Sequence, residues 1–166
     1  MKKLLIIIFI VVVLGIIGFE YYWFNSPFTL SSVKMPTSIN TFTQANLETM
    51  GTYLVTRNGE NFINLCNYVT YNPESSLNRV YICEPKGSPE NSLNSWRTAQ
   101  MDFLNQGGQK FSSNEQNING VNVKTVTISN ENCGNPGFCT TYYWKQGKII
   151  FSSNTRQLVE GFIEVN

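Results

Sequence analysis

The feature that most limits how this chain can fold is an unbroken apolar run near its N-terminus. Residues 4–19 are 16 consecutive apolar positions, and Lys2 and Lys3 precede them. A transmembrane helix needs roughly 20 residues to cross the hydrocarbon core. The aromatic residues of 21–24 complete that length and suit the boundary between lipid and water. Because basic residues stay on the cytoplasmic side, we expect a single-pass signal-anchor helix over 4–24, with the rest of the chain outside the cytoplasm.

A cleaved signal peptide is the alternative to an uncleaved anchor. Cleavage requires small residues at the A-x-A positions, and the first tolerable site, at residues 29–31, lies well beyond the apolar run. We therefore expect residues 1–3 to remain as a cytoplasmic stub of a cell-membrane protein. Residues 25–41 are rich in Ser, Thr and Pro and predict an extracytoplasmic linker. Residues 42–166 are then long enough for one extracytoplasmic domain.

Composition and charge narrow the classes of function. The net charge is +1, only 14% of the residues are charged, and the 12 Lys and Arg residues are scattered along the chain. Nucleic-acid binding requires clustered basic charge, so we expect no nucleic-acid partner. The chain contains no His, which removes the commonest general base, and the spacing of Asp102 and the glutamates nominates no catalytic pair. We therefore expect no enzyme activity, no catalytic or metal-binding residues and no cofactor.

Four cysteines, Cys66, Cys83, Cys133 and Cys139, all follow the expected anchor. Disulfides persist outside the cytoplasm, whereas zinc sites favour close C-x2-C pairs and usually His. Two disulfides are therefore favoured over a metal site. Four cysteines allow three pairings, and we favour Cys66–Cys83 with Cys133–Cys139 because each of these pairs closes a short loop.

Three segments have features of helices. Ser88 and Pro89 suit the N-cap and the first helical position, and apolar residues follow at helical spacing, which predicts a helix over 88–105. The apolar residues of 60–69 recur at i, i+1, i+3, i+4 and i+7 and predict a second helix, although the end of this segment also fits a strand. A short final helix is expected after a cap at Asn154 or Thr155. Its inward-facing residues are Leu158, Val159, Phe162 and Ile163.

Other segments have the composition of β-strands. Residues 79–83 predict one strand and residues 121–129 another. The apolar residues of the second segment change phase between Val123 and Val126, which predicts a β-bulge near Lys124.

The segment 138–153 predicts a β-hairpin. A two-residue turn at Gln146-Gly147 pairs Trp144 with Ile149 and places Tyr143 and Ile150 together on the opposite face. One face of a sheet is normally buried, and we expect it to be the face of Trp144. Tyr143 and Ile150 are then the candidate exposed binding surface, for a glycan or a partner protein.

Together these segments predict an α+β fold: an N-terminal transmembrane helix followed by a small antiparallel β-sheet domain with two to three packed helices. The function that fits best is a non-catalytic interaction or assembly module of the cell envelope, attached to the membrane through 4–24, with an envelope protein or a glycan as partner. The alternative is a carrier or sensor that binds a small apolar ligand or a glycan between the sheet and the helix 88–105. A deep apolar cavity under Trp96 would favour the carrier, and a packed core would favour the module.

Overall fold

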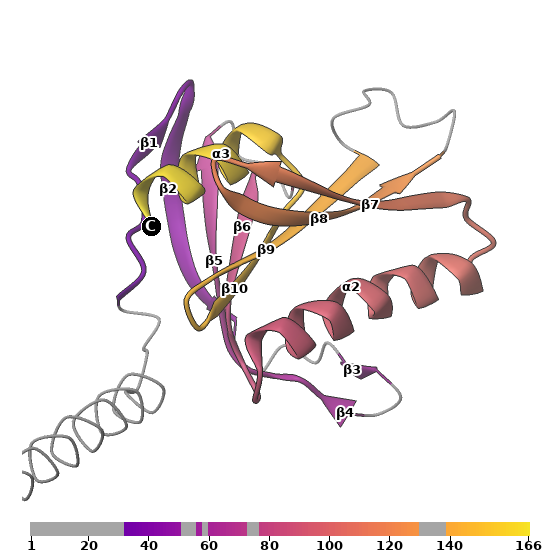
Figure 1. Ribbon diagram of the computed structural model, residues 1–166. Coiled ribbons are helices and arrows are strands. Elements are labelled where there is room, and N and C mark those ends of the chain that lie inside the picture. Colours follow the sequence, from indigo (N-terminus) through magenta and orange to yellow (C-terminus); the bar gives the residue numbers. More distant parts are fainter. Residues whose placement is uncertain (1–31, 51–55, 58–59, 73–76, 130–138) are drawn as a thin grey trace, which may run out of the picture.

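The described part of the chain folds into one large antiparallel sheet with a helix against each face (Figure 1). The computed structural model describes residues 32–50, 56–57, 60–72, 77–129 and 139–166. The eight strands of the sheet lie in the order β1-β2-β5-β6-β10-β9-β8-β7, and every neighbouring pair is antiparallel. The strands are β1 (Ser38–Ile39), β2 (Phe42–Met50), β5 (Ile63–Asn72), β6 (Arg79–Pro85), β7 (Phe111–Ile118), β8 (Val121–Ile128), β9 (Thr140–Gln146) and β10 (Ile149–Ser153). A separate two-stranded sheet is formed by β3 (Thr56–Arg57) and β4 (Glu60–Asn61).

The topology consists of two meanders that meet in the middle of the sheet. The chain first forms β1, β2, β5 and β6 in spatial order, and then crosses one face as helix α2 (Pro89–Gln106) to reach the far edge at β7. From there β8, β9 and β10 return, until β10 pairs with β6. Helix α3 (Arg156–Val165) follows β10 directly. The coarse expectation of an α+β fold with an antiparallel sheet is therefore confirmed, and the sheet is larger than the small sheet domain expected from the sequence.

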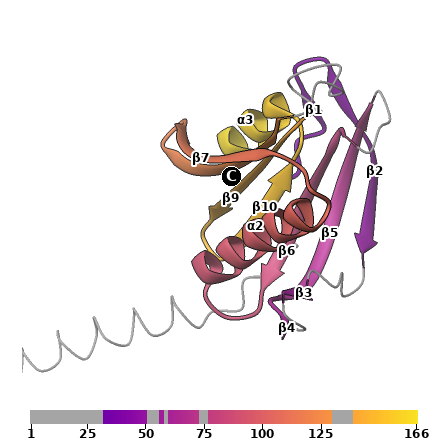
Figure 2. The same ribbon diagram turned by 90° about the vertical axis from the view of Figure 1, so that its right-hand side faces the viewer.

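Helices α2 and α3 pack on the sheet at separate places (Figure 2). The buried side chains form two separate cores, one under each helix. The core under α3 contains Trp144 and Phe151, whose rings stack with centroids 5.1 Å apart. The core under α2 contains Leu93 of that helix together with Tyr143 and Ile150 of the sheet. Successive side chains of a strand point to opposite faces, so each central strand contributes to both cores.

Both helices lie where the sequence patterns predict them. Helix α2 begins at Pro89 as expected and ends before Gly107, while Gly108 has a φ of 66°, a conformation that glycine favours at helix C-termini. Ser88 is the N-cap residue, but its side chain makes no capping hydrogen bond. Helix α3 has Thr155 as its N-cap residue. Its buried residues are the expected four, Leu158, Val159, Phe162 and Ile163.

The helix predicted over 60–69 is wrong, because this segment contributes most of strand β5. The register between β5 and β6 shifts between Ile63 and Leu65. This irregularity brings Ile63 and Cys66 into the same core under α2 although they are three residues apart. A β-bulge can thus reproduce the i, i+3 spacing that indicates a helix.

The bulge predicted near Lys124 is also wrong, because β8 pairs with β7 and β9 without a register shift. Val123 lies in the core under α3, and Val126 lies in the core under α2. The change of phase in the sequence therefore reflects a strand that is buried on both faces. No irregularity of the backbone is needed to explain it.

The hairpin of β9 and β10 forms, with its turn one residue later than predicted. Gln146 pairs with Ile149, so the turn residues are Gly147 and Lys148, and Trp144 lies opposite Phe151. Gly147 has a φ of 56°, and glycine in this conformation favours the first turn position of a type II′ turn. When the turn moves by one residue, the residue opposite each position changes by two. Because side chains alternate between faces with a period of two, the residues that share a face are still the predicted ones.

The folded domain begins earlier than expected. Val33 and Ile39 belong to the core under α3, and β1 pairs with β2. The C-terminal part of the linker expected over 25–41 is therefore part of the domain, because its apolar side chains are buried by α3. The expected stub, the anchor over 4–24 and the alternative cleavage site lie outside the described residues.

Candidate functional site

The surface expected at Tyr143 and Ile150 is not exposed, and this prediction is wrong. Tyr143 is 1% exposed and Ile150 is 0% exposed. Both belong to the core that α2 covers. Tyr143 and Ile150 do share a face of the hairpin, as predicted, but α2 covers that face.

Aromatic and aliphatic side chains pack between α2 and the sheet. Trp96 of α2 packs edge-on against Tyr143, with ring centroids 5.7 Å apart, and against Tyr81 of β6 at 6.5 Å. Leu93 and Leu104, nearer the two ends of the helix, are also buried. Burial raises the pKa of the Tyr143 hydroxyl, which keeps this residue uncharged in the core.

A disulfide connects two strands beneath α2. Cys66 of β5 and Cys83 of β6 lie directly opposite each other in the register and are bonded, as favoured from the sequence. Both residues are buried, so the bond joins the strands inside the core. Cys139 is also disulfide-bonded, and Cys133 lies outside the described residues.

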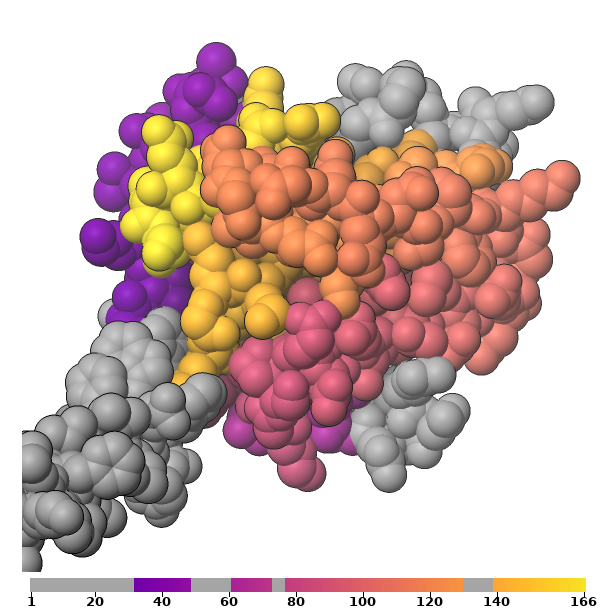
Figure 3. Space-filling model, in the orientation of Figure 1, coloured from indigo at the N-terminus to yellow at the C-terminus, as the bar shows by residue number. Residues whose placement is uncertain are grey.

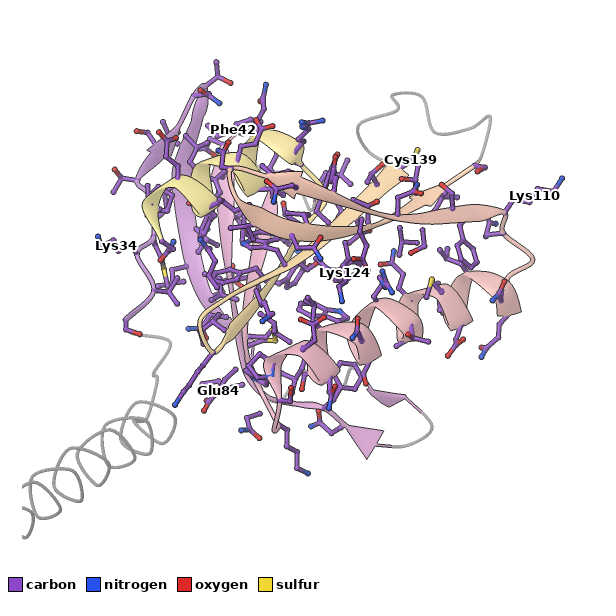
Figure 4. All side chains as sticks on the ribbon, viewed as in Figure 1. Lys34, Phe42, Glu84, Lys110, Lys124 and Cys139 are labelled. Atoms are coloured by element: carbon purple, nitrogen blue, oxygen red, sulfur yellow. A yellow bond between two sulfur atoms is a disulfide. The ribbon has the colours of Figure 1, made fainter. Side chains whose placement is uncertain are left out.

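A buried lysine joins β8 to the first turns of α2. Lys124 is 6% exposed, and its ammonium group donates a hydrogen bond to Oδ1 of Asn94 at 2.6 Å and forms an ion pair with Glu90 (Figure 4). Glu115 of β7, directly opposite in the register, lies 3.9 Å from the Lys124 nitrogen. A buried charge is stable only when paired and hydrogen-bonded, and Lys124 meets this requirement.

The carboxylates around Lys124 complete a charged cluster between helix and sheet. Glu90 also lies 3.7 Å from the Lys145 nitrogen, and Glu115 lies 3.4 Å from a guanidinium nitrogen of Arg97. The hydrogen bond from Lys124 lowers the pKa of Glu90. For Glu115, a hydrogen bond from Asn122 lowers the pKa, with Lys124 and Arg97 adding to the effect. The cluster therefore holds α2 on the sheet through charges that satisfy one another.

A small cavity of about 230 Å³ lies between the first and last described residues of the domain. It is lined by residues 32–34, by the start of the β9–β10 turn and by the end of α3. The side chain of Asn166 spans this region: its Oδ1 accepts from the backbone N–H of Lys34, and its Nδ2 donates to the Lys34 carbonyl, both at 2.8 Å. Pockets for small ligands usually measure roughly 300–1,000 Å³. This cavity is therefore better explained as a seam between two chain segments.

Strand β7, at one edge of the sheet, is largely exposed. Residues 112–115 and 117 of this strand are all exposed, and the hairpin of β7 and β8 lies at the surface (Figure 3). The exposed residues are Ser, Asn and Glu. This edge is therefore an exposed polar surface, whereas Tyr143 and Ile150 are buried.

Other chemistry receives no support from the described residues. Among them, no group of three or more His, Cys, Asp or Glu side chains could hold a metal ion. Within the same residues, no helix has the length and apolar character to cross a membrane. No family model, curated protein or solved structure matches the chain. Any functional inference therefore depends on the residues and the fold themselves.

Sequence reasoning missed both the Lys124 cluster and the β7 edge. The members of the cluster lie on α2, β7, β8 and β9, and their separations along the chain give no common signal. The edge position of β7 depends on the order of strands in the sheet. The sequence signal that could have indicated the cluster is Lys124 within the largely apolar segment 121–129. A lysine that is buried in such a strand needs an oppositely charged partner.

Proposed function

We propose that this chain is a non-catalytic interaction or assembly module of the cell envelope, attached to the membrane by a single helix over 4–24. The apolar run and its flanking lysines support the attachment and its direction. The disulfide between Cys66 and Cys83 supports an extracytoplasmic domain, because such bonds are rare in the cytoplasm. An envelope protein or a glycan is the partner class that this location favours.

The observation that most favours a module over a carrier is the packing under α2. A carrier of the kind considered from the sequence needs a ligand cavity beneath Trp96. In that place Trp96 contacts Tyr81 and Tyr143, and Tyr143 and Ile150 are buried. Because these side chains already occupy the space, a ligand would have to displace the core, which costs several kcal/mol per large buried residue.

The first experiment tests the location. Protease added to the outside of intact cells should digest the domain of the full-length chain, and membrane disruption should not be needed. A matched control variant, Lys2→Glu with Lys3→Glu, removes the basic residues that orient the anchor and should reduce this digestion. Complete protection of the unmodified chain would contradict the proposal.

The second experiment separates the module from the carrier. The full-length chain, purified in detergent, is analysed by native mass spectrometry after gentle release from the micelle. The module predicts a mass that one or more copies of the polypeptide account for in full, with no bound small molecule. A stoichiometric small molecule that is lost on Trp96→Ala substitution would favour the carrier instead.

A further inference from the structure

Among the described residues, no strand pairs with the outer side of strand β7. Within the described parts of the chain, β7 has a neighbouring strand on one side only, β8. The hydrogen bond from the Ser129 N–H to the Lys110 carbonyl extends the ladder between the two strands. In an antiparallel pair such bonded positions alternate. The even-numbered residues of β7 therefore bond to β8, and the N–H and C=O groups of residues 111, 113, 115 and 117 point outward.

Within the described residues, this edge lacks several features that normally prevent strands from pairing with other chains. Natural edge strands are protected by proline, lysine, bulges or short length. Strand β7 has 8 residues, contains neither proline nor lysine, and pairs with β8 without a register shift. Its one charged side chain, Glu115, lies beside Arg97 and Lys124 of its own chain. At the opposite edge of the sheet, β1 pairs only with Phe42 and Thr43 of β2, but the register between β2 and β5 shifts between Gln44 and Asn46, unlike that of β7 with β8.

We propose that β7 pairs with β7 of a second copy of this chain, antiparallel and around a two-fold axis, so that the two sheets become continuous. In such a dimer the outward-pointing residues must bond to one another, which requires odd-numbered positions to lie opposite odd-numbered positions. The two-fold axis then lies midway between one residue of β7 and the same residue of the other copy, and below it is named by that residue. The proposal deepens the proposed function, because it names the partner of the assembly module, and it rests on that function.

The charge of Glu115 and the length of the strand select the register. An axis at residue 115 would place two glutamates directly opposite each other, which is unfavourable. An axis at Ser113 or Gln116 would leave several residues of the strand unpaired. An axis at Asn114 pairs every residue from 111 to 117 and places Glu115 opposite Ser113 of the other copy. The exposed polar side chains of β7 then lie against polar side chains.

Cysteine cross-linking of the full-length chain in its membrane tests this register. Asn114→Cys places one cysteine on the axis, at a pair without mutual hydrogen bonds, where the two Cα atoms lie about 4.5 Å apart. A disulfide spans that distance. The described cysteines are all bonded already, and the unmodified chain serves as background. We expect a disulfide-linked dimer on mild oxidation of the Asn114→Cys chain.

A matched variant at the same exposed face provides the control. In this register Ser112 lies opposite Gln116 of the other copy, so two cysteines at position 112 are four residues out of register, about 13 Å apart. Ser112→Cys alone should therefore give no cross-link. Co-expression of Ser112→Cys with Gln116→Cys chains should restore a mixed dimer.

A proline substitution tests whether the outward backbone groups make the contact. Proline is tolerated on an edge strand where its N–H faces solvent, so Ser113→Pro should leave the fold intact. It should abolish the cross-link of the Asn114→Cys chain, because it removes a hydrogen bond of the dimer. Retention of the Cys66–Cys83 bond and of the unfolding midpoint shows that the domain is folded.

The possible results each decide the question. A dimer at Asn114→Cys that is absent at Ser112→Cys and lost with Ser113→Pro supports the pairing. A folded Asn114→Cys chain that stays monomeric in the membrane overturns it, as does equal cross-linking at 112, 114 and 116, which would indicate random collision. The protease test of location has a separate readout. Failure of the β7 pairing is therefore distinguishable from failure of the proposed function.

Discussion

The contact between Gly161 of α3 and Ile39 of β1 offers a sharp test of how the C-terminal helix docks on the sheet. A Cβ atom at position 161 would lie 2.5 Å from Cγ2 of Ile39 and 2.9 Å from both Cγ1 and Cδ1. Ile39 is 6% exposed, and its branched side chain has few alternative rotamers. Gly161→Ala must therefore displace either the helix or the β1 segment.

The expected magnitude follows from two opposing effects. One extra methyl group in a packed core costs roughly 1–3 kcal/mol, whereas alanine is favoured over glycine inside a helix by about 1 kcal/mol. In the unmodified chain, the two effects give a net loss of stability of up to about 2 kcal/mol. When Ile39→Ala removes the obstructing side chain, Gly161→Ala should stabilise the domain by about 1 kcal/mol. The coupling between the two positions is then about 1–3 kcal/mol.

The measurement is urea unfolding of the full-length chain in detergent, followed by tryptophan fluorescence. Four proteins complete the cycle: the unmodified chain, Gly161→Ala, Ile39→Ala and the double variant. Gln157→Ala, at an exposed position of α3, is the control for helix propensity alone. If Gly161→Ala stabilises the chain equally in both backgrounds, α3 does not pack on β1 as described and the reasoning is refuted.

Three further perturbations test the core under α2 and the charged cluster. Replacing both Cys66 and Cys83 by alanine should lower the free energy of unfolding by about 3 kcal/mol, from the loop of 17 residues that the bond closes; an unchanged urea midpoint would contradict this. Tyr143→Ala should lower the free energy of unfolding by about 3–5 kcal/mol in the same assay. Unchanged stability together with lost partner binding would instead indicate that Tyr143 is exposed. Because the pKa values of Glu90 and Glu115 are lowered in the folded state, the unfolded state takes up protons first. The contribution of these two groups is complete above their ordinary pKa of 4.5 and is lost as the pH falls through the folded-state values. Between about pH 6 and pH 3, the midpoint of thermal unfolding should fall less for Glu90→Gln than for the unmodified chain. An equal fall of the midpoint with pH in both proteins would exclude the cluster as a source of stability.

Local patterns in the sequence determined the helices, the faces of the hairpin and one disulfide. The segment 88–105 has its start and stop residues and its apolar stripe within one stretch of chain, so short-range physics is sufficient to predict α2. The same holds for α3, whose four buried residues were all identified. In the hairpin, side chains alternate between faces, so Trp144 and Tyr143 lie on opposite faces of the sheet for either position of the turn. The pairing of Cys66 with Cys83 followed from the short loop between them.

Only the tertiary structure decided which faces are covered and which charges meet. Alternation shows that the two faces of a strand differ, but it cannot show that α2 returns across the face of Tyr143 and Ile150. Lys124 is stable in the core only because residues from α2 and β7 surround it. The segment 60–69 resembles a helix because a bulge in β5 reproduces helical spacing. These features depend on contacts between segments far apart in the chain, and the free energy of such contacts exceeds the local preferences that a sequence pattern records.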